Sequence, residues 1–516
     1  MRCIELHWLA ASRGGVALLA ILVCAQALLG STKPRYGGTL RVEVLAQSIS
    51  IDPRAWKPGS REFGTNERLA ALVFDRLVSV DSYGRFVGQL ATEWSHDASS
   101  RRWQFALRPG VKFSDGAALT AAAAATSLMP LLPEGVQVSA SGDDLIFQCA
   151  ESRPDLLEML ASGRFFIYRM QADSSLLGTG PFTLDGNAKN EKSTGNDPNA
   201  AGISTPVVSH FTANEICWAG RPFLDKIEVF YGIPPLRALF DLQAGRADLV
   251  ELAPDVVRRA NQSNVRVWAS LPVTLYLLRF DSTQSQTAND QLREALALSL
   301  DRATMAGVLL QKQAEPAAAL LPQWLSGYAF LFRAEMDLDR VKQLRAALPS
   351  NVAGGTSPLR LQTDILGDLA RLLAERVTVN VRQTGIAVQP FNKAGAHDAG
   401  AHAQESADLH LFAWRYSTLS PAEELRGLAK AALAGVNVAE GKLSEADRRY
   451  VEERKILEER KVIPLVTVPD YAGIAANVRD WQASSWGGWR LADVWLEPPA
   501  TQKNVDAGYT APGVRP

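Results

Sequence analysis

The fold is decided by residues 77–125, which end in RRWQFALRPGVKFSDGAALTAAAAA over residues 101–125. In residues 103–108 the bulky apolar side chains alternate with other residues, which predicts a half-buried strand. Pro109-Gly110 predicts a tight turn, because proline presets one dihedral angle and glycine accepts a positive φ. Thr120 precedes an alanine run and is expected to cap a helix. The stretch therefore predicts an α/β protein.

Six further motifs follow a fixed order along the chain. They are GGTL at 37–40, GTGPF at 178–182, RPFLDKI at 221–227, RADLV at 246–250, LDRA at 300–303 and IPL at 463–465. Together with the opening stretch they resemble the family 5 extracellular solute-binding proteins, the dipeptide, oligopeptide and nickel receptors of ABC importers. The resemblance spans roughly residues 36–495, and the order of the motifs carries it.

The resemblance implies a type II periplasmic-binding-protein fold, with two lobes joined by a hinge and an extra subdomain in the first lobe. The hinge is expected near residues 271–275 and 482–487. The implied divisions are a signal peptide at 1–31, lobe I at 36–47, 176–270 and 485–516, the extra subdomain at 48–175, and lobe II at 271–484.

The N-terminus predicts export. Arg2 and Arg13 precede an apolar run at 16–29, and small residues follow, as in a cleavable leader. The run is marginal in length for a membrane span, so cleavage is favoured over an uncleaved anchor. Lipid anchoring at Cys24 stays open, although Val23 stands where a lipoprotein signal has a small residue. The protein is expected to be periplasmic or otherwise extracytoplasmic.

Composition limits the partners and the chemistry. The chain has 54 basic and 55 acidic residues, so its charge predicts neither nucleic acid nor an anionic membrane as a partner. It lacks the GxSxG, GxxxxGK[ST], HExxH and strand-linked GxGxxG motifs, so no catalytic residue and no cofactor are predicted. We expect a monomer. Cys149 and Cys217 can pair in an exported protein, but the sequence does not show that they meet.

One histidine cluster raises a metal site as an alternative. His397, His402 and His410 lie close in sequence to Asp398 and Asp408. Side chains of these types can bind a transition metal. The surrounding residues are polar and rich in glycine and alanine, which favours a solvated loop. No metal site is predicted.

The candidate ligand site begins at residues 414–417, Trp-Arg-Tyr-Ser. Relatives that bind peptides usually carry a tryptophan followed three positions later by an aspartate that holds the peptide ammonium group. Here Ser417 takes that position, so the standard peptide mode is in doubt. Trp414 suits stacking on a ligand, and Arg415 suits bidentate contact with an anionic group. A buried core role for Trp414 and a surface role for Arg415 are equally open.

Other aromatic residues complete the candidate site. Tyr276 and Phe280 lie on a predicted strand at 273–281 that resembles the crossover strand of the family, and Trp324 follows in a loop expected near the cleft. The predicted ligand-binding set is therefore Trp414, Arg415, Tyr416, Ser417, Tyr276, Phe280 and Trp324.

The sequence thus predicts a receptor that delivers a peptide or another small solute to ABC permease subunits without changing it covalently. A sensor or assembly protein that kept the fold but has a degenerate cleft is the alternative. An exported hydrolase is the least favoured.

Overall fold

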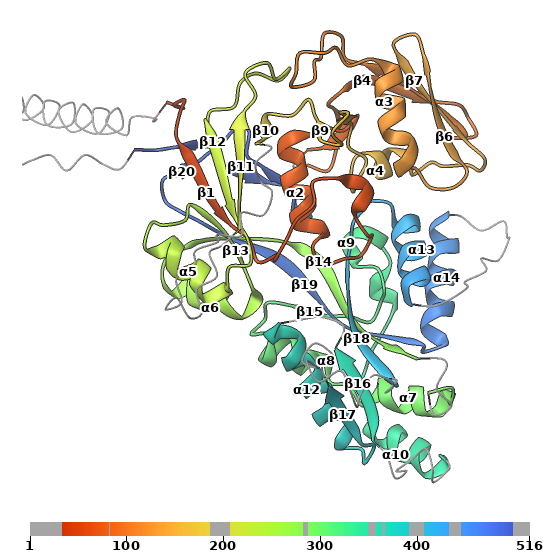
Figure 1. Ribbon diagram of the computed structural model, residues 1–516. Coiled ribbons are helices and arrows are strands. Elements are labelled where there is room, and N and C mark those ends of the chain that lie inside the picture. Colours follow the sequence, from red (N-terminus) through yellow and green to blue (C-terminus); the bar gives the residue numbers. More distant parts are fainter. Residues whose placement is uncertain are drawn as a thin grey trace, which may run out of the picture.

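The computed structural model describes residues 33–498 apart from 82, 186–206, 282–286, 349–357, 364–366, 392–406 and 433–444 (Figure 1). The predicted leader with Cys24, and His397, Asp398 and His402 of the histidine cluster, lie outside the described residues.

A large mixed sheet runs through the molecule. Its strands follow the order β10-β11-β12-β1-β13-β19-β14-β18-β16-β17, and β15 pairs with β19. The bounds are β1 (Thr39–Glu43), β10 (Phe182–Leu184), β11 (Val208–Ala213), β12 (Lys226–Phe230), β13 (Leu249–Leu252), β14 (Arg266–Phe280), β15 (Glu315–Pro316), β16 (Leu359–Thr363), β17 (Val388–Phe391), β18 (Leu409–Arg415) and β19 (Val462–Ile474).

The antiparallel strands β14 and β19 connect the two ends of this sheet (Figure 1). Their register shifts between Ala269 and Thr274, where the hinge is predicted. The Leu271 N–H donates to the Ser485 carbonyl at 2.6 Å, so the two predicted hinge segments are in contact. The hinge and the domain limits stay predictions.

Two large hydrophobic cores lie at opposite ends of these long strands. The first gathers residues between Leu40 and Leu249 and takes in Ala472 to Val494 near the C-terminus. The second gathers residues between Tyr276 and Leu411, with Ile463 to Val468 from β19. The sheet thus carries one core on each side of the predicted hinge.

A separate four-stranded sheet, in the order β4-β5-β7-β6, forms the outer part of the first end. Its strands are β4 (Ala91–His96), β5 (Arg102–Leu107), β6 (Val136–Ser141) and β7 (Asp144–Cys149), and α3 (Ala121–Leu128) follows the alanine run. Trp103 and Phe105 are buried on one face, and Thr120 Oγ1 accepts from the Ala123 N–H at 3.2 Å. Gly110 has φ +76°. The predicted strand, turn and cap are confirmed.

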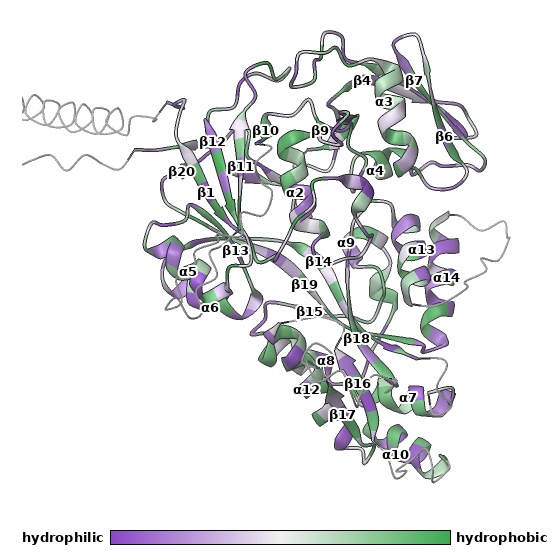
Figure 2. Cartoon of the chain, in the orientation of Figure 1, coloured by the Kyte–Doolittle hydropathy of each residue, from purple (hydrophilic) through white to green (hydrophobic). Residues whose placement is uncertain are grey.

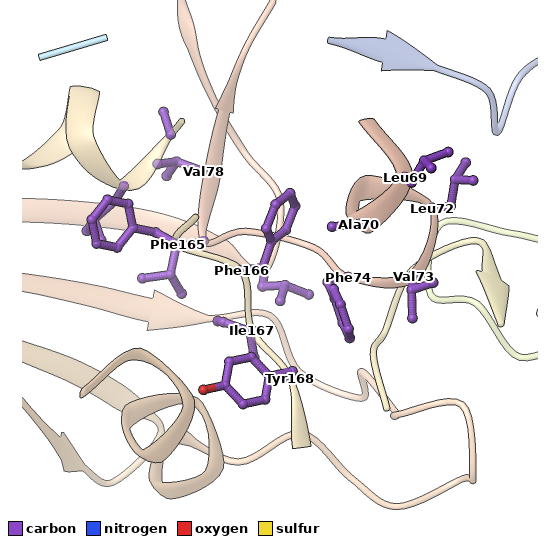
Figure 3. Packing of buried hydrophobic residues seen from close by; sticks show 14 of the residues in the cluster. Leu69, Ala70, Leu72, Val73, Phe74, Val78, Phe165, Phe166, Ile167 and Tyr168 are labelled. Atoms are coloured by element: carbon purple, nitrogen blue, oxygen red, sulfur yellow. The ribbon is translucent and has the colours of Figure 1, made fainter. Parts of the chain in front are cut away.

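Helix α2 (Phe63–Val73) contributes Leu69, Ala70, Leu72 and Val73 to the first hydrophobic core, which also contains Phe74 and Phe166 (Figure 3). The spacing of the apolar residues over 62–80 favours one long helix, but Phe74 is extended and residues 78–80 form β2. The glycines of the GTGPF motif lie against the C-terminal end of helix α2 at Val73. Cβ atoms added to Gly178 and Gly180 would lie 1.8 and 2.7 Å from the Val73 carbonyl oxygen, so only glycines allow this approach.

The remaining helices cover the sheet. Figure 2 shows hydrophilic and hydrophobic residues mixed along α14, as expected for a helix with one face on a core. The bounds are α4 (Leu156–Leu160), α5 (Pro235–Gln243), α6 (Pro254–Gln262), α7 (Asp290–Leu298), α8 (Arg302–Thr304), α9 (Gln323–Ser326), α10 (Leu338–Ala347), α12 (Asp368–Arg382), α13 (Pro421–Ala432) and α14 (Glu445–Glu458).

The short strands pair in twos. They are β2 (Val78–Val80) with β3 (Phe86–Gly88), β8 (Arg169–Met170) with β9 (Leu176–Leu177), β20 (Val478–Arg479) with β23 (Trp495–Leu496), and β21 (Gln482–Ala483) with β22 (Trp489–Arg490).

Cys149 and Cys217 are both buried and both free thiols, so the disulfide that the sequence left open is not formed. Burial raises the pKa of each thiol. Across the described ranges, no helix has the length and apolar character needed to cross a membrane.

Candidate functional site

The candidate site lies where the end of β18 and the turn at 414–420 meet residues of the first core. The Arg415 N–H donates to the Gly59 carbonyl at 3.0 Å in an isolated antiparallel bridge. The Trp414 ring lies directly against Gly59, where an added Cβ would be 2.1 Å from the ring, and its Cζ2 atom lies by Gly427, where an added Cβ would be 3.2 Å away. Trp414 is therefore a packed side chain here, and its predicted stacking on a ligand stays a prediction.

Glu424, in the first turn of α13, organises this turn of the chain. Its carboxylate accepts from Trp414 Nε1 at 2.7 Å, from the Ser417 N–H at 2.6 Å, from Ser417 Oγ at 2.8 Å and from the Thr418 N–H at 2.7 Å. The residue is 1% exposed. Burial raises the pKa of Glu424, and these hydrogen bonds oppose the rise. The carboxylate at this turn thus comes from position 424 and is held by the chain itself.

Arg415 is 4% exposed and lies in a charge-balanced network. Its guanidinium contacts Asp470 at 2.9 Å, and Asp470 also pairs with Arg68 of α2. Arg68 in turn pairs with Glu251, so two cations face two carboxylates. Burial lowers the pKa of Arg415, opposed by the charge of Asp470. The predicted contact between Arg415 and an anionic ligand would therefore compete with Asp470, and it stays a prediction.

A small cavity of about 10 Å³ lies beside this network. That volume is of the order that one water molecule needs. Trp324 and Tyr416 meet there edge to face, with ring centroids 6.3 Å apart. The structure thus brings three predicted residues, Trp324, Tyr416 and Ser417, to one cavity. The full lining is Glu67, Ser162, Val273, Trp324, Tyr416, Ser417, Thr418, Leu419 and Trp486.

Tyr276 and Phe280 do not line this cavity. Both are buried in the second core, where Tyr276 pairs with Ala413 and Phe280 with Leu409 across β14 and β18. Phe280 lies six residues beyond Thr274, about 20 Å along the strand. Their ligand-binding role stays a prediction that this arrangement does not support.

Residues 153–163 contact the same turn. The Leu419 N–H donates to Ser162 Oγ at 2.9 Å, and the Ser162 hydroxyl donates to Thr418 Oγ1 at 3.2 Å. Arg153 pairs with Glu423 at 2.7 Å. These contacts join the predicted extra subdomain to the predicted second lobe, so the candidate site is closed over by the chain.

Sequence reasoning missed Glu67, Ser162, Trp486 and Glu424. The available signal was the sequence Ser420-Pro421-Ala422-Glu423, which has the spacing of a capping box: a serine followed three positions later by a glutamate. The structure forms half of it, because the Glu423 N–H donates to Ser420 Oγ at 3.2 Å while the Glu423 carboxylate pairs with Arg153. The neighbouring Glu424 is the residue that holds the turn.

A second buried carboxylate positions the wall of the cavity. Glu453 of α14 accepts from the Leu320 N–H at 2.5 Å and from the Leu321 N–H at 3.0 Å. The Tyr416 hydroxyl donates to the Leu320 carbonyl at 2.6 Å. Burial raises the pKa of Glu453 to about 7. Glu453 therefore holds the segment that carries both Trp324 and the partner of Tyr416.

This raised pKa predicts a pH dependence of stability. A carboxyl that binds its proton more tightly in the folded state stabilises the fold at low pH, and this contribution is lost as pH rises from about 4.5 to about 7. Over this pH range the Glu453 carboxyl should lower the free energy of unfolding of the wild type by about 2 to 3 kcal/mol. Urea unfolding at both ends of the range should show that Glu453→Gln does not undergo this part of the decrease. Glu458→Gln, on the same helix, is the control. Equal pH slopes for the wild type and Glu453→Gln would contradict the prediction.

Of the histidine cluster that raised a metal site as an alternative, only Asp408 and His410 lie within the described residues. Asp408 accepts from the Arg360 N–H at 2.8 Å, and His410 lies in β18. In the parts of the chain with described coordinates, no group of three histidine, cysteine, aspartate or glutamate residues could hold a metal ion.

Comparison with known proteins places this geometry in a family. The family model for bacterial extracellular solute-binding proteins, family 5 Middle, matches residues 85–432, more than half of the chain. The nickel-binding periplasmic protein of Escherichia coli is 23% identical over 409 residues, covering 71% of this chain and 73% of that protein.

Solved structures share the fold. NikA from Staphylococcus aureus, in complex with Ni(L-His)2, has a TM-score of 0.69 and 16% identity, covering 89% of this chain and 100% of that chain. Haemophilus influenzae OppA, in complex with RPPGFSPFR, has a TM-score of 0.71 and 14% identity, covering 90% and 100%. The predicted type II periplasmic-binding-protein fold is confirmed. With a family match over residues 85–432 and this fold, the chain belongs to the bacterial extracellular solute-binding proteins of family 5.

Proposed function

We propose that this chain is an extracytoplasmic receptor that binds a peptide or peptide-like small solute without changing it covalently and delivers it to permease subunits of an ABC importer. Family membership supports solute binding. The relatives differ in their named ligands: one is a nickel-binding periplasmic protein, whereas OppA was solved with a peptide. The second supports a peptide as the ligand class. No observation favours the sensor alternative.

The observation that carries the proposal is the cavity between residues of the first core and the turn at 416–419. Trp324, Tyr416 and Trp486 supply apolar rings, while Ser162 and Ser417 supply hydroxyl groups. In the present arrangement this cavity has room for about one water molecule, so a solute binds there only after the two sides separate. The mixture of apolar walls and a few polar groups then suits non-covalent binding of a small organic solute.

The proposed mechanism is closure about the predicted hinge. The register shifts between Ala269 and Thr274, together with the bond from Leu271 to Ser485, support bending at residues 271–275 and 482–487. A ligand binding between Ser162 and Thr418 selects the closed arrangement, which the importer reads. In the open arrangement these groups are exposed to solvent.

A solute screen tests the proposal. Protein comprising residues 32–516 is unfolded thermally in the presence of peptides, sugars, amino acids, opines and nickel chelates. A solute that binds only the folded state stabilises it by about 2.7 kcal/mol at a hundredfold excess over its Kd. We expect a shift with peptides or a peptide-like class. The absence of a shift with every class would overturn the receptor function.

The matched variants are Trp324→Ala and Trp94→Ala. Both side chains are half-buried, but Trp324 lines the cavity whereas Trp94 lies on β4 of the outer sheet. Each shift is measured against the unfolding temperature of the same variant without ligand. The rise in unfolding temperature that the ligand causes should be lost in Trp324→Ala and kept in Trp94→Ala. Equal rises in both variants would mean that the ligand binds elsewhere.

A further inference from the structure

The charged side chains around the cavity are neutralised by partners within the chain. Glu67, which lines the cavity, pairs with Arg76 at 2.6 Å. Arg415 pairs with Asp470 at 2.9 Å. Neither pair presents a net charge to a ligand that enters between Ser162 and Thr418.

The polar groups of Ser417 also have hydrogen-bond partners within the chain. The Ser417 N–H and hydroxyl and the Thr418 N–H all donate to Glu424. Since Ser417 Oγ is 2.8 Å from the Glu424 carboxylate, an ionised carboxylate at 417 would face a second one at hydrogen-bond distance. The serine and Glu424 are therefore coupled, and the two described carboxylates at this turn, Glu423 and Glu424, both have partners within the chain.

The edge of β18 beside this turn has main-chain groups that can pair. β18 pairs with β14 along Leu409–Arg415 but with β16 only at Leu409–Leu411, so among the described strands none pairs with the other edge of β18 beyond Leu411. Gly59 pairs with this edge at Arg415 through a main-chain hydrogen bond of 3.0 Å. Main-chain pairing at a strand edge recognises peptide-like ligands without using their terminal charges.

We propose that this receptor prefers peptide-like ligands whose two ends carry no charge over the free zwitterionic peptides of the same sequence. The inference rests on the proposed function, because it specifies the ligand of that same cavity. A buried ammonium group without a carboxylate partner costs free energy that a neutral amide does not. Among the charged residues described around the cavity, Glu67 and Arg415 would give a ligand terminus a partner only if the ion pair with Arg76 or Asp470 were broken.

The test uses one library of mixed tripeptides in two forms, free and N-acetylated with a C-terminal amide. Retention by ultrafiltration with mass spectrometry identifies the best sequence, and isothermal titration compares its two forms. We expect the capped form to bind at least about tenfold more tightly. The charged ends of the free form give up their hydrogen bonds to water on binding and gain no charged partner in return. Equal binding, or tighter binding of the free form, would overturn the inference and leave the receptor function intact.

If neither form binds, the inference fails, and the solute screen then separates the two failures. A thermal shift with another solute class would keep the receptor function, whereas no shift with any class would remove it as well.

A double variant reverses the preference. In Ser417→Asp with Glu424→Gln, the new carboxylate no longer faces a second one, and the single oxygen of glutamine can accept from the Thr418 N–H, while the hydrogen bond from Trp414 Nε1 to the other carboxylate oxygen is lost. This variant should bind the free peptide more tightly than the capped one, while Glu424→Gln alone keeps the wild-type preference. A double variant with the wild-type preference would contradict the assignment of position 417.

Discussion

Replacing Glu424 by alanine is expected to lower the free energy of unfolding by about 3 to 5 kcal/mol. Four donors, from Trp414, Ser417 and Thr418, converge on this carboxylate, which is 1% exposed. Alanine leaves those donors buried without an acceptor and opens a cavity under Trp414. Urea unfolding followed by circular dichroism measures the loss.

Glu424→Gln separates hydrogen bonding from charge. Glutamine keeps one acceptor oxygen and nearly the same volume, so its loss of stability should be well below that of alanine. Because burial raises the pKa of Glu424, part of the cost of the ionised carboxylate is also removed. An alanine variant within about 1 kcal/mol of the wild type would show that water satisfies these donors and that Glu424 does not organise the turn.

Replacing Gly59 by alanine is expected to cost about 2 to 5 kcal/mol and to separate the two halves of the candidate site. Gly59 has φ +79°, and an added Cβ would lie 2.1 Å from the Trp414 ring, which is itself packed on Gly427. The ring has no room to move, so the segment at Gly59 has to leave β18. Small-angle scattering should then show a larger radius of gyration, and urea unfolding the lower stability.

Gly110→Ala is the matched control. Gly110 has φ +76°, nearly the same backbone strain, but nothing lies within 4 Å of its added Cβ. The Gly110→Ala variant should be destabilised only by the backbone strain of alanine at positive φ. Its free energy of unfolding should fall by about 1 to 2 kcal/mol, with an unchanged radius of gyration. Equal losses in both variants would mean that the contact between Gly59 and Trp414 contributes nothing to closure.

These contacts bear on how the receptor works. A ligand that enters between Ser162 and Thr418 has to replace hydrogen bonds that the chain already makes there. Its differential affinity for the closed arrangement sets how far it shifts the balance between open and closed forms. Gly59→Ala, which removes a contact of the unliganded closed form, should therefore also change ligand affinity.

The sequence by itself determined the local elements and the family. The alternation in residues 103–108, the cap at Thr120 and the motif order depend on neighbours in the chain, where periodicity and turn chemistry act. These features led to the fold and to solute binding. They also drew attention to residues 414–417, of which Tyr416 and Ser417 line the cavity together with Trp324.

Only the tertiary structure decided what these side chains contact. Segments that are distant in sequence come together in the fold, and this sets the contacts of each side chain. As a result Trp414 packs on Gly59, Arg415 pairs with Asp470, and Cys149 and Cys217 stay unpaired. No local pattern encodes the partner of a buried charge, because that partner is set by long-range packing. For the same reason the sequence showed the missing aspartate at Ser417, but only the fold showed Glu424 already bound to that serine.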